Sequence, residues 1–186
     1  AVRGSGGVKI ARPAEFQEAC WQARQKLKTF GLMPTLRKFG TNYLYAPFYR
    51  GGFAHQNNYN IAQCSDDYYQ QISPEAWSRF LEANQGCHGC PVHCRHYASL
   101  KDGKYRGVAG GGYEFGSFQP YLNWYGSSSI PFAMAATQFC NDYGMDGSEP
   151  GMLLAWATDC FIKGLISEKE TDGLRLDWGD EEVALS

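Results

Sequence analysis

The stretch Gly86-Cys87-His88-Gly89-Cys90-Pro91-Val92-His93-Cys94 carries three of the seven cysteines of this chain within nine residues. Its C-x2-C-x3-C spacing brings three thiolates to one point, and three thiolates are three of the four ligands of an iron-sulfur cluster. The other cysteines show no matching spacing, so we expect them to be core or surface thiols. They are Cys20, Cys64, Cys140 and Cys160.

Two other interpretations of the clustered cysteines remain open. A disulfide framework is disfavoured by the odd number of cysteines and by the lack of a signal peptide in the sequence. A structural zinc site is a stronger alternative, because His88, His93 and His96 stand among the thiols and Cys3His is a common zinc ligand set. Against zinc, the segment has no second half-site downstream. The radical-SAM pattern has the two spacings in the opposite order and does not match.

Composition and charge limit the class of protein. The chain has 186 residues, of which 44% are hydrophobic and 15% aromatic, as expected for one globular domain with a sizeable core. The net charge of −2 gives nucleic-acid binding no electrostatic basis. No apolar run approaches the roughly 20 residues that span a bilayer. We therefore expect a cytoplasmic protein in a reducing compartment, with no membrane span.

The sequence divides at about residue 12. Residues 1–12 contain short Val and Ile pieces around glycines and are typical of a strand or linker that leaves a preceding domain. Residues 13–186 show mainly helical periodicity, without an internal repeat. We expect a mainly α domain that carries the cluster ligands and short β pieces.

The individual elements follow from spacing and capping signals. Helices are predicted over 13–29, 74–84, 129–143 and 148–163, and a capping box predicts a last short helix from Ser167. Residues 97–112 are expected to form a hairpin or irregular loop with a turn at Asp102-Gly103. Residues 30–73 are rich in Gly, Asn and aromatic residues and lack periodicity, which is typical of either a binding segment or aromatic packing between helices.

Taken in order, several motifs resemble the aldehyde ferredoxin oxidoreductase family, the tungsten-containing bis-pterin enzymes. The motifs are Ala1-Val2-Arg3-Gly4, Gly86 to Cys94, Tyr113-Glu114, Cys140-Asn141-Asp142-Tyr143-Gly144-Met145-Asp146, Lys163-Gly164-Leu165-Ile166 and Leu176-Asp177-Trp178-Gly179-Asp180. The resemblance covers nearly the whole chain. It implies the irregular helical middle domain of that family, domain 2.

The resemblance also implies cofactors and their ligands. Cys87, Cys90 and Cys94 resemble three ligands of the family's 4Fe-4S cluster, whose fourth ligand is expected outside this chain. The segment with Asp142, Gly144, Met145 and Asp146 resembles the one that binds one pterin. In it, Asp142 is expected to accept hydrogen bonds from the pterin ring, and Met145 stands where the family usually has Leu.

Two residues are candidates for catalysis. Glu114 matches the family's carboxylate beside the metal, a general acid or base, and its aromatic neighbours would desolvate it. A cysteine would stand there in the branch that reduces arylcarboxyl-CoA esters, so Glu114 favours aldehyde oxidation. His55 resembles a proton donor of the CoA-ester branch, although a lone His in an aromatic loop is more often a satisfied hydrogen-bonding residue.

The predicted function is oxidation of an aldehyde to a carboxylic acid by a tungsten, or else molybdenum, bis-pterin and a 4Fe-4S cluster. Ferredoxin or an iron-sulfur partner subunit would accept the electrons, and the flanking domains of the enzyme and further copies of it are the other expected partners. Reduction of an aryl-CoA ester is the alternative within the family. A non-catalytic electron-transfer module and a zinc-stabilised domain are the alternatives outside it.

Overall fold

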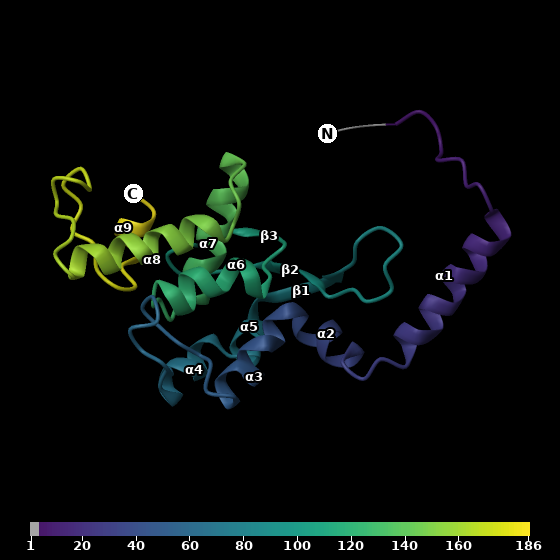
Figure 1. Cartoon of the computed structure of the whole chain (residues 1–186), viewed down its shortest axis with the longest axis horizontal. Helices are drawn as coiled ribbons and strands as arrows, with labels where there is room; N and C mark the ends of the chain where they lie inside the picture. Colours follow the sequence, from purple (N-terminus) through teal and green to yellow (C-terminus); the bar gives the residue numbers. More distant parts are fainter. Residues whose placement is uncertain (1–3) are drawn as a thin grey trace.

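The computed structural model describes residues 4–186 and shows a mainly helical chain with one small sheet (Figure 1). The prediction of a mainly α domain with short β pieces is confirmed. Residues 4–12 form neither helix nor strand. Residues 1–3 of the predicted first strand lie outside the described residues, so the division of the chain at residue 12 stays a prediction.

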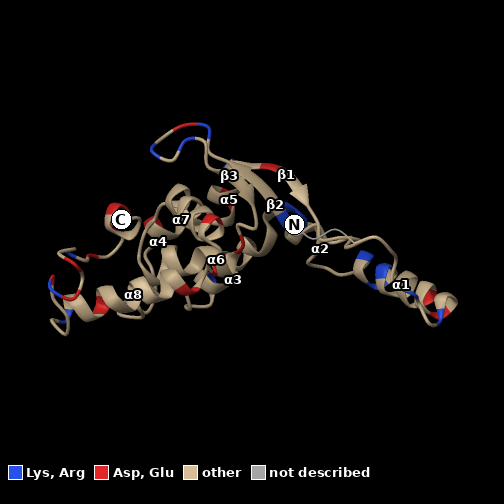
Figure 2. Ribbon diagram, turned by 90° about the horizontal axis from the view of Figure 1, so that it is seen from above, with Lys and Arg blue, Asp and Glu red and all other residues tan. Residues whose placement is uncertain are grey.

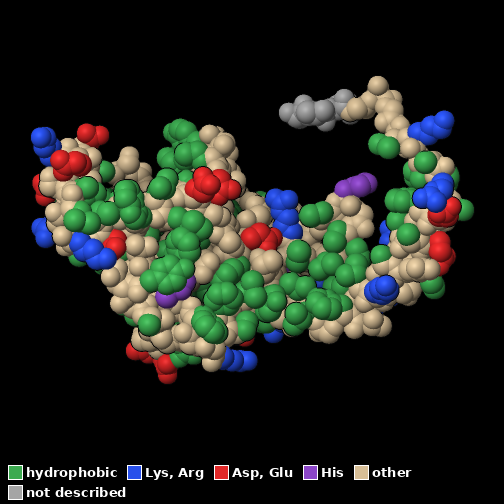
Figure 3. All heavy atoms as spheres, viewed as in Figure 1, with side chains coloured by type: hydrophobic (Ala, Val, Ile, Leu, Met, Phe, Trp, Pro, Cys, Tyr) green, Lys and Arg blue, Asp and Glu red, His purple; other side chains and the backbone are tan. Residues whose placement is uncertain are grey.

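Helix α1 (Pro13–Lys28) stands apart from the body of the molecule (Figure 1). Pro13 is the first residue of the helix, where the N–H that proline lacks would have no partner within the helix. Lysines stand in the last turn, where their positive charge interacts favourably with the negative end of the helix dipole. None of its residues is buried. Phe16 and Trp21 are 52% and 57% exposed, and hydrophobic side chains are visible along this helix as well as on the body (Figure 3).

The segment from 30 to 73 is more regular than its sequence indicates. It contains α2 (Met33–Phe39), the 3-10 helix η1 (Gly40–Leu44), α3 (Tyr45–Arg50) and α4 (Asp66–Ile72). These helices have five to seven residues, too few turns for a helical period to stand out. Tertiary packing of aromatic side chains stabilises them, as the stacked rings of Tyr49 and Tyr69 with centroids 4.0 Å apart illustrate.

The helix predicted over 74–84 is wrong in its second half. Helix α5 (Pro74–Trp77) begins at the predicted Ser73 cap and passes through η2 (Ser78–Phe80) into strand β1 (Leu81–Gln85). Strand β1 pairs antiparallel with β2 (Arg95–Ser99). Strand β2 in turn pairs antiparallel with β3 (Ala109–Gly111), which is the hairpin predicted over 97–112. The cysteine stretch is therefore the loop of a β-hairpin, bounded by the Gln85 and Arg95 pair.

The core lies where α6 (Phe115–Gln119), η3 (Pro120–Trp124), α7 (Ile130–Tyr143) and α8 (Glu149–Ile162) pack together. Helix α7 begins and ends as the sequence predicts. Ser129 accepts a hydrogen bond from the N–H of Phe132 at 3.1 Å, and Gly144 ends the helix at φ +70°. Phe132 and Leu122 are fully buried there.

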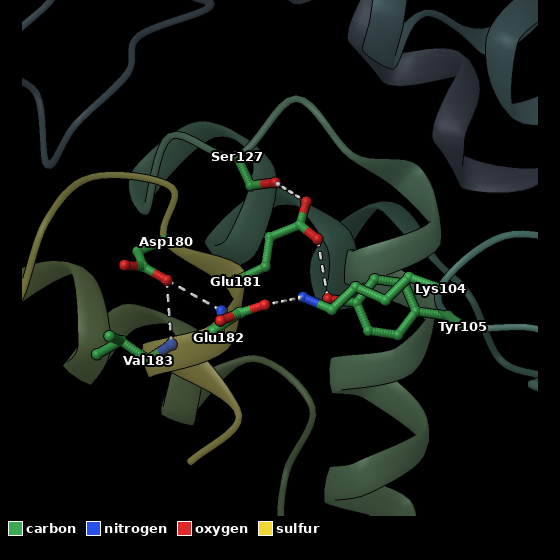
Figure 4. A network of polar contacts seen from close by, with 7 residues as sticks. All are labelled: Lys104, Tyr105, Ser127, Asp180, Glu181, Glu182 and Val183. Carbon is green, nitrogen blue, oxygen red and sulfur yellow. Dashed lines mark hydrogen bonds and ion pairs between the residues drawn. The ribbon is translucent and has the colours of Figure 1, made fainter.

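The chain ends on a short helix that the sequence did not predict, α9 (Glu181–Ala184). Its carboxylates contact the body: Tyr105 Oη donates to Glu181 at 2.8 Å, and Lys104 pairs with Glu182 at 3.4 Å (Figure 4). The helix predicted from Ser167 is wrong, because residues 167–173 form only turns. The hydroxyl of Ser167 does contact the Glu170 carboxylate at 2.7 Å, but no helical run follows it.

No helix among the described residues is long and apolar enough to cross a bilayer. All seven cysteines are free thiols, and the four outside the cluster motif are buried or half-buried.

Candidate functional site

The cysteine loop is held at its base by α2. The backbone oxygen of Arg37 accepts hydrogen bonds from Asn84 Nδ2 at 2.9 Å and from His96 Nε2 at 3.0 Å, on the two strands that flank the loop. The guanidinium of Arg37 reaches into the loop and donates to the oxygen of Pro91 at 2.8 Å. One residue of α2 therefore fixes both ends and the middle of the loop.

Gly40 brings η1 against the same loop. It lies at φ +63° and ψ −156°, a conformation that is essentially confined to glycine. A Cβ atom at this position would lie 2.6 Å from the Cys94 oxygen and 2.9 Å from His96 Nδ1. Only glycine permits this approach of η1 to Cys94.

Gly40→Ala should destabilise the fold by at least about 1–3 kcal/mol, the usual cost of such a backbone conformation, with the contact to Cys94 adding to it. Thermal unfolding would measure the effect. Gly52→Ala is the matched control, because Gly52 has φ +75° but open space around its Cβ position. Equal loss of stability in both variants would contradict the role of the Cys94 contact.

The three thiols lie on one open loop. Cys87 is exposed, Cys90 and Cys94 are half-buried, and the N–H of Cys90 donates to the Cys87 oxygen at 3.0 Å. Burial raises the pKa of the Cys94 thiol, and the negative charges of Glu114, Cys90 and Cys87 raise it further. A hollow of about 610 Å³ adjoins Cys87 and Cys90.

Glu114 lies at the beginning of α6, where the sequence turns out of β3. Thr41 of η1 donates its hydroxyl to the Glu114 carboxylate and accepts the N–H of Phe115 at 2.9 Å. The backbone N–H of Glu114 donates to Ser117 Oγ at 3.1 Å. The Glu114 side chain is half-buried beside the buried Tyr113. The carboxylate is therefore oriented by the element that also contacts the cysteine loop.

The structure thus brings together two predicted site residues from separate motifs. The charge of Glu114 acts on the Cys94 thiol, while Gly40 and Thr41, which are adjacent in η1, contact Cys94 and Glu114 respectively. The predicted catalytic carboxylate and one predicted cluster ligand are consequently both contacted by the same short helix.

His55 lies in an aromatic hollow of about 770 Å³. It is buried, and its ring stacks on that of Tyr59 with centroids 3.8 Å apart. Its Nδ1 lies 3.2 Å from the oxygen of Phe53, which can only accept, so Nδ1 carries the proton. Burial lowers the pKa of His55, which favours the neutral ring. Nε2 has no partner among the described residues, and neither has the Trp124 Nε1 that shares the hollow.

Three consecutive left-handed residues support this hollow. Asn57, Asn58 and Tyr59 have φ between 48° and 66°, an uncommon run for residues other than glycine. Asp159 of α8 holds the run by accepting from Asn60 Nδ2 at 2.7 Å, and Lys163 pairs with Asp159 at 2.7 Å. Residues about 100 positions apart therefore position the ring that covers His55.

The predicted pterin segment lies at the end of α7 and is exposed throughout. Asp142 accepts a hydrogen bond from Gln138 Nε2 at 2.7 Å and has no other partner among the described residues. Gly144 is the left-handed cap, and Met145 is 42% exposed. Asp146 accepts from the N–H groups of Ser148 at 2.7 Å and Glu149 at 3.2 Å, which lower its pKa. Asp146 therefore has a structural role at the beginning of α8.

The family model for aldehyde ferredoxin oxidoreductase, domains 2 and 3, matches residues 18–186. This chain belongs to the aldehyde ferredoxin oxidoreductase family. A tungsten-containing aldehyde ferredoxin oxidoreductase of Thermococcus kodakarensis is 26% identical over 185 residues, 98% of this chain and 30% of the relative. An aliphatic sulfonate oxidoreductase, WOR-like subunit, of Pyrococcus furiosus is 29% identical over 98% of this chain and 29% of its own length. The chain thus spans about 30% of the length of these relatives.

As a member of the aldehyde ferredoxin oxidoreductase family, the chain has a donor set that fits a cluster. Among residues 4–186, no group of three or more His, Cys, Asp or Glu is arranged to hold a metal ion. In a 4Fe-4S cluster each thiolate binds a different iron, so the thiolates need not converge on one ion. The loop offers three free thiols as such ligands, and two of them, Cys87 and Cys90, line an open hollow. The exposed carboxylate of Asp142 similarly fits a planar N–H donor such as a pterin ring.

Sequence reasoning missed the residues that support the site. Arg37, Gly40 and Thr41 fall in the segment where no periodicity is visible, and Trp124 lies in no sequence motif. Gly40 follows the cationic pair Arg37-Lys38 and ends α2, which is a helix-stop signal that could have indicated a boundary. Its contact with Cys94 has no signal in the sequence.

Asp142→Ala should lower pterin and tungsten occupancy of the full-length enzyme and leave its Tm nearly unchanged, because Gln138 is its partner in the fold. Loss of a charge-assisted hydrogen bond costs about 1.5–3 kcal/mol, or roughly a tenfold to hundredfold weaker retention. Metal analysis and pterin fluorescence would measure occupancy. Asp146→Ala is the comparison: it should lower the Tm, because the N–H groups of Ser148 and Glu149 at the start of α8 would lose their acceptor. Full cofactor occupancy in Asp142→Ala would contradict the pterin role.

Proposed function

We propose that this chain is the cluster-binding part of an enzyme that oxidises an aldehyde to a carboxylic acid. One observation carries the proposal. Two adjacent residues of η1 contact both motifs: Gly40 lies against the Cys94 end of the cysteine loop, and Thr41 donates to the Glu114 carboxylate. A redox enzyme that also transfers a proton needs an electron-transfer group and an acid or base held in fixed positions, and η1 contacts a candidate for each. Membership of an oxidoreductase family supports the same conclusion.

The chain's own residues would hold the cofactors. Cys87, Cys90 and Cys94 would bind a 4Fe-4S cluster with a fourth ligand from outside this chain. Asp142, in the segment ending at Asp146, would hold one pterin of a tungsten bis-pterin. When bound, these groups supply the two-electron oxidation and transfer the electrons outward.

Glu114 would move the proton. Oxidation of an aldehyde by water gives the acid, two electrons and two protons, so a base must take a proton from the attacking oxygen. Its carboxylate is half-buried beside Tyr113, and the Thr41 hydroxyl orients it. Phe115, the residue after Glu114, packs against Phe48 with ring centroids 5.2 Å apart, and Phe48 lines the hollow that contains His55. That hollow would receive the substrate.

Reduction of an aryl-CoA ester is the second candidate, and the hollow favours it specifically. Its walls include Phe48, Phe53, Tyr59 and Trp124, which suit an aromatic ring. His55 would then donate the proton that the reduced ring requires, and it would have to be protonated first. Its lowered pKa opposes this at neutral pH, so we place aldehyde oxidation first.

Purification of the full-length protein without oxygen tests the proposal. We expect tungsten, pterin, iron and acid-labile sulfide, together with aldehyde-dependent reduction of a viologen dye. Iron and sulfide without tungsten or pterin would favour an electron-transfer module instead. Zinc without sulfide would show that the loop is a structural zinc site. Turnover of aryl-CoA esters but not of aldehydes would favour the second candidate.

A further inference from the structure

The aromatic hollow around His55 contains two polar atoms that the fold leaves without a partner. Eight buried side-chain nitrogen or oxygen atoms of residues 4–186 form no hydrogen bond, and two of them belong to residues that line this hollow. They are His55 Nε2 and Trp124 Nε1. Leaving a buried polar group unpaired is unfavourable, so a ligand that supplies both missing partners gains affinity from the hollow.

The two atoms have opposite hydrogen-bonding roles. Nδ1 of His55 carries the proton, because it lies 3.2 Å from the oxygen of Phe53, so Nε2 presents a lone pair and can only accept. The indole nitrogen of Trp124 can only donate. The two ring centroids lie 6.0 Å apart. An oxygen that bridges two nitrogens through hydrogen bonds of about 2.9 Å spans up to about 5.8 Å between them. The rings are thus close enough for one ligand atom that both donates and accepts to serve both residues.

The rest of the wall is uncharged. Aromatic rings form most of it, and no Asp, Glu, Lys or Arg of residues 4–186 lines it. Residues 107–162, which include Gln119 and Trp124 of this wall, contain no Lys or Arg, and α6 and α7 carry no blue in Figure 2. Ionised groups avoid such surroundings unless they are paired. The ligand that this wall fits is an aromatic ring with a neutral polar substituent.

We propose that the hollow recognises an aryl aldehyde that carries a hydroxyl group on its ring. The inference rests on the proposed function, in which the hollow receives the aldehyde. A phenolic hydroxyl is a donor and an acceptor in one atom: it would donate to His55 Nε2 and accept from Trp124 Nε1. Its ring would pack among the aromatic side chains of the wall. His55 and Trp124 then determine specificity, because they select hydroxylated over unsubstituted aryl aldehydes.

Access to the two nitrogens requires Tyr59 to move. Neither nitrogen is accessible to water, and the ring of Tyr59 covers His55 by stacking on it with centroids 3.8 Å apart. The same ring lies 5.8 Å from that of Trp124. Tyr59 is 61% exposed, so its ring can turn outward without disturbing the core. A hydroxylated ring offsets this movement by supplying both missing hydrogen bonds, whereas an apolar ring does not.

Two other groups could pair with the same nitrogens. One is a buried water molecule, which bridges polar groups in many proteins. The other is a side chain from a part of the full-length enzyme outside this chain. Either group would remove the advantage of a hydroxyl on the ligand, so a comparison of hydroxylated and apolar rings distinguishes them from the proposal.

The test measures ligand binding to the full-length holoenzyme by isothermal titration calorimetry. The probes are phenol, which donates and accepts, anisole, which only accepts, and toluene, which does neither. The variants are Trp124→Phe and His55→Phe, singly and combined, since phenylalanine retains a ring but has no nitrogen. Trp156→Phe is the matched control, because Trp156 is 60% exposed on α8 and does not line the hollow. Toluene binding reports whether the hollow persists in each variant.

We expect phenol to bind the wild type at least about tenfold more tightly than toluene, as expected for hydrogen bonds to buried groups. Anisole should gain little, because it leaves His55 Nε2 unpaired. Each single variant should lose most of the preference for phenol, and the double variant little more, since one hydroxyl serves both nitrogens. Trp156→Phe should keep the full preference. Equal binding of phenol and toluene by the wild type, or an unchanged preference in the double variant, would overturn the proposal.

Turnover separates this inference from the proposed function. The kcat/KM for meta- or para-hydroxybenzaldehyde should exceed that for the corresponding tolualdehyde by at least about tenfold, at a pH where the phenol keeps its proton. Aldehyde oxidation without this preference, and without a preference for phenol over toluene, would leave the proposed function intact and remove the inference. A preference for phenol in an enzyme that oxidises no aldehyde would retain recognition of the hydroxylated ring and remove the proposed function.

Discussion

Replacing Cys87, Cys90 or Cys94 by serine should remove most of the iron from the full-length enzyme and lower its Tm. A thiolate is the ligand that an iron-sulfur cluster requires, and a hydroxyl does not replace it well. Binding free energy of a metal group is also folding free energy, so the loss should destabilise the loop and its contacts. Iron and acid-labile sulfide per chain, together with thermal unfolding, measure both effects.

The loop geometry allows a sharp control. Cys160→Ser alters a half-buried thiol on α8, away from the cysteine loop, and should leave iron and sulfide unchanged. Cys20→Ser on α1 should do the same. If iron fell equally in all five variants, the assignment of the three clustered ligands would be wrong. If zinc replaced iron in the wild type, the loop would be a structural zinc site.

Glu114→Gln should reduce aldehyde turnover by about 10²- to 10⁴-fold, the usual contribution of one general acid or base. The amide keeps the shape of the side chain and can still accept from the Thr41 hydroxyl, so the fold should be preserved. Tungsten, pterin and iron contents should match those of the wild type. Steady-state rates with an aldehyde and a viologen measure the effect, and undiminished turnover would refute the catalytic role.

Two companion variants sharpen this result. Thr41→Val removes the hydroxyl that orients Glu114 and should give a smaller loss of turnover, since the carboxylate itself remains. His55→Ala should raise KM for the aldehyde more than it lowers kcat, because His55 lies in the aromatic hollow. If His55→Ala instead abolished turnover of an aryl-CoA ester with the cofactors intact, the second candidate function would be favoured.

Capping residues in the sequence correctly predicted helix ends, because such ends depend on interactions within a few residues. The start and end of α7 follow from Ser129 and Gly144, because a side-chain cap and a left-handed glycine act on the nearest turn. The wrong half of the helix predicted over 74–84 shows the limit of such signals. Residues 81–85 become a strand because they pair with 95–99 across the cysteine loop, and that pairing lies outside any local window.

The Ser167 capping box also shows that a local signal alone does not determine a helix. Its side-chain contacts form as predicted, yet no helix follows. A cap adds about 1 kcal/mol to an existing helix, whereas nucleating a helix without an apolar face to bury is unfavourable. Residues 167–173 contain no large apolar side chain, and packing therefore contributes little.

By itself, the sequence determined the donor chemistry of this protein: three thiols at one spacing, a carboxylate before α6 and another at the end of α7. Residue type and short spacing suffice for this, because each motif is local. Only the tertiary structure decided that Cys94 and Glu114 share the support of Gly40 and Thr41. That arrangement depends on packing between segments more than 50 residues apart, and packing at such separation leaves no pattern in a single sequence.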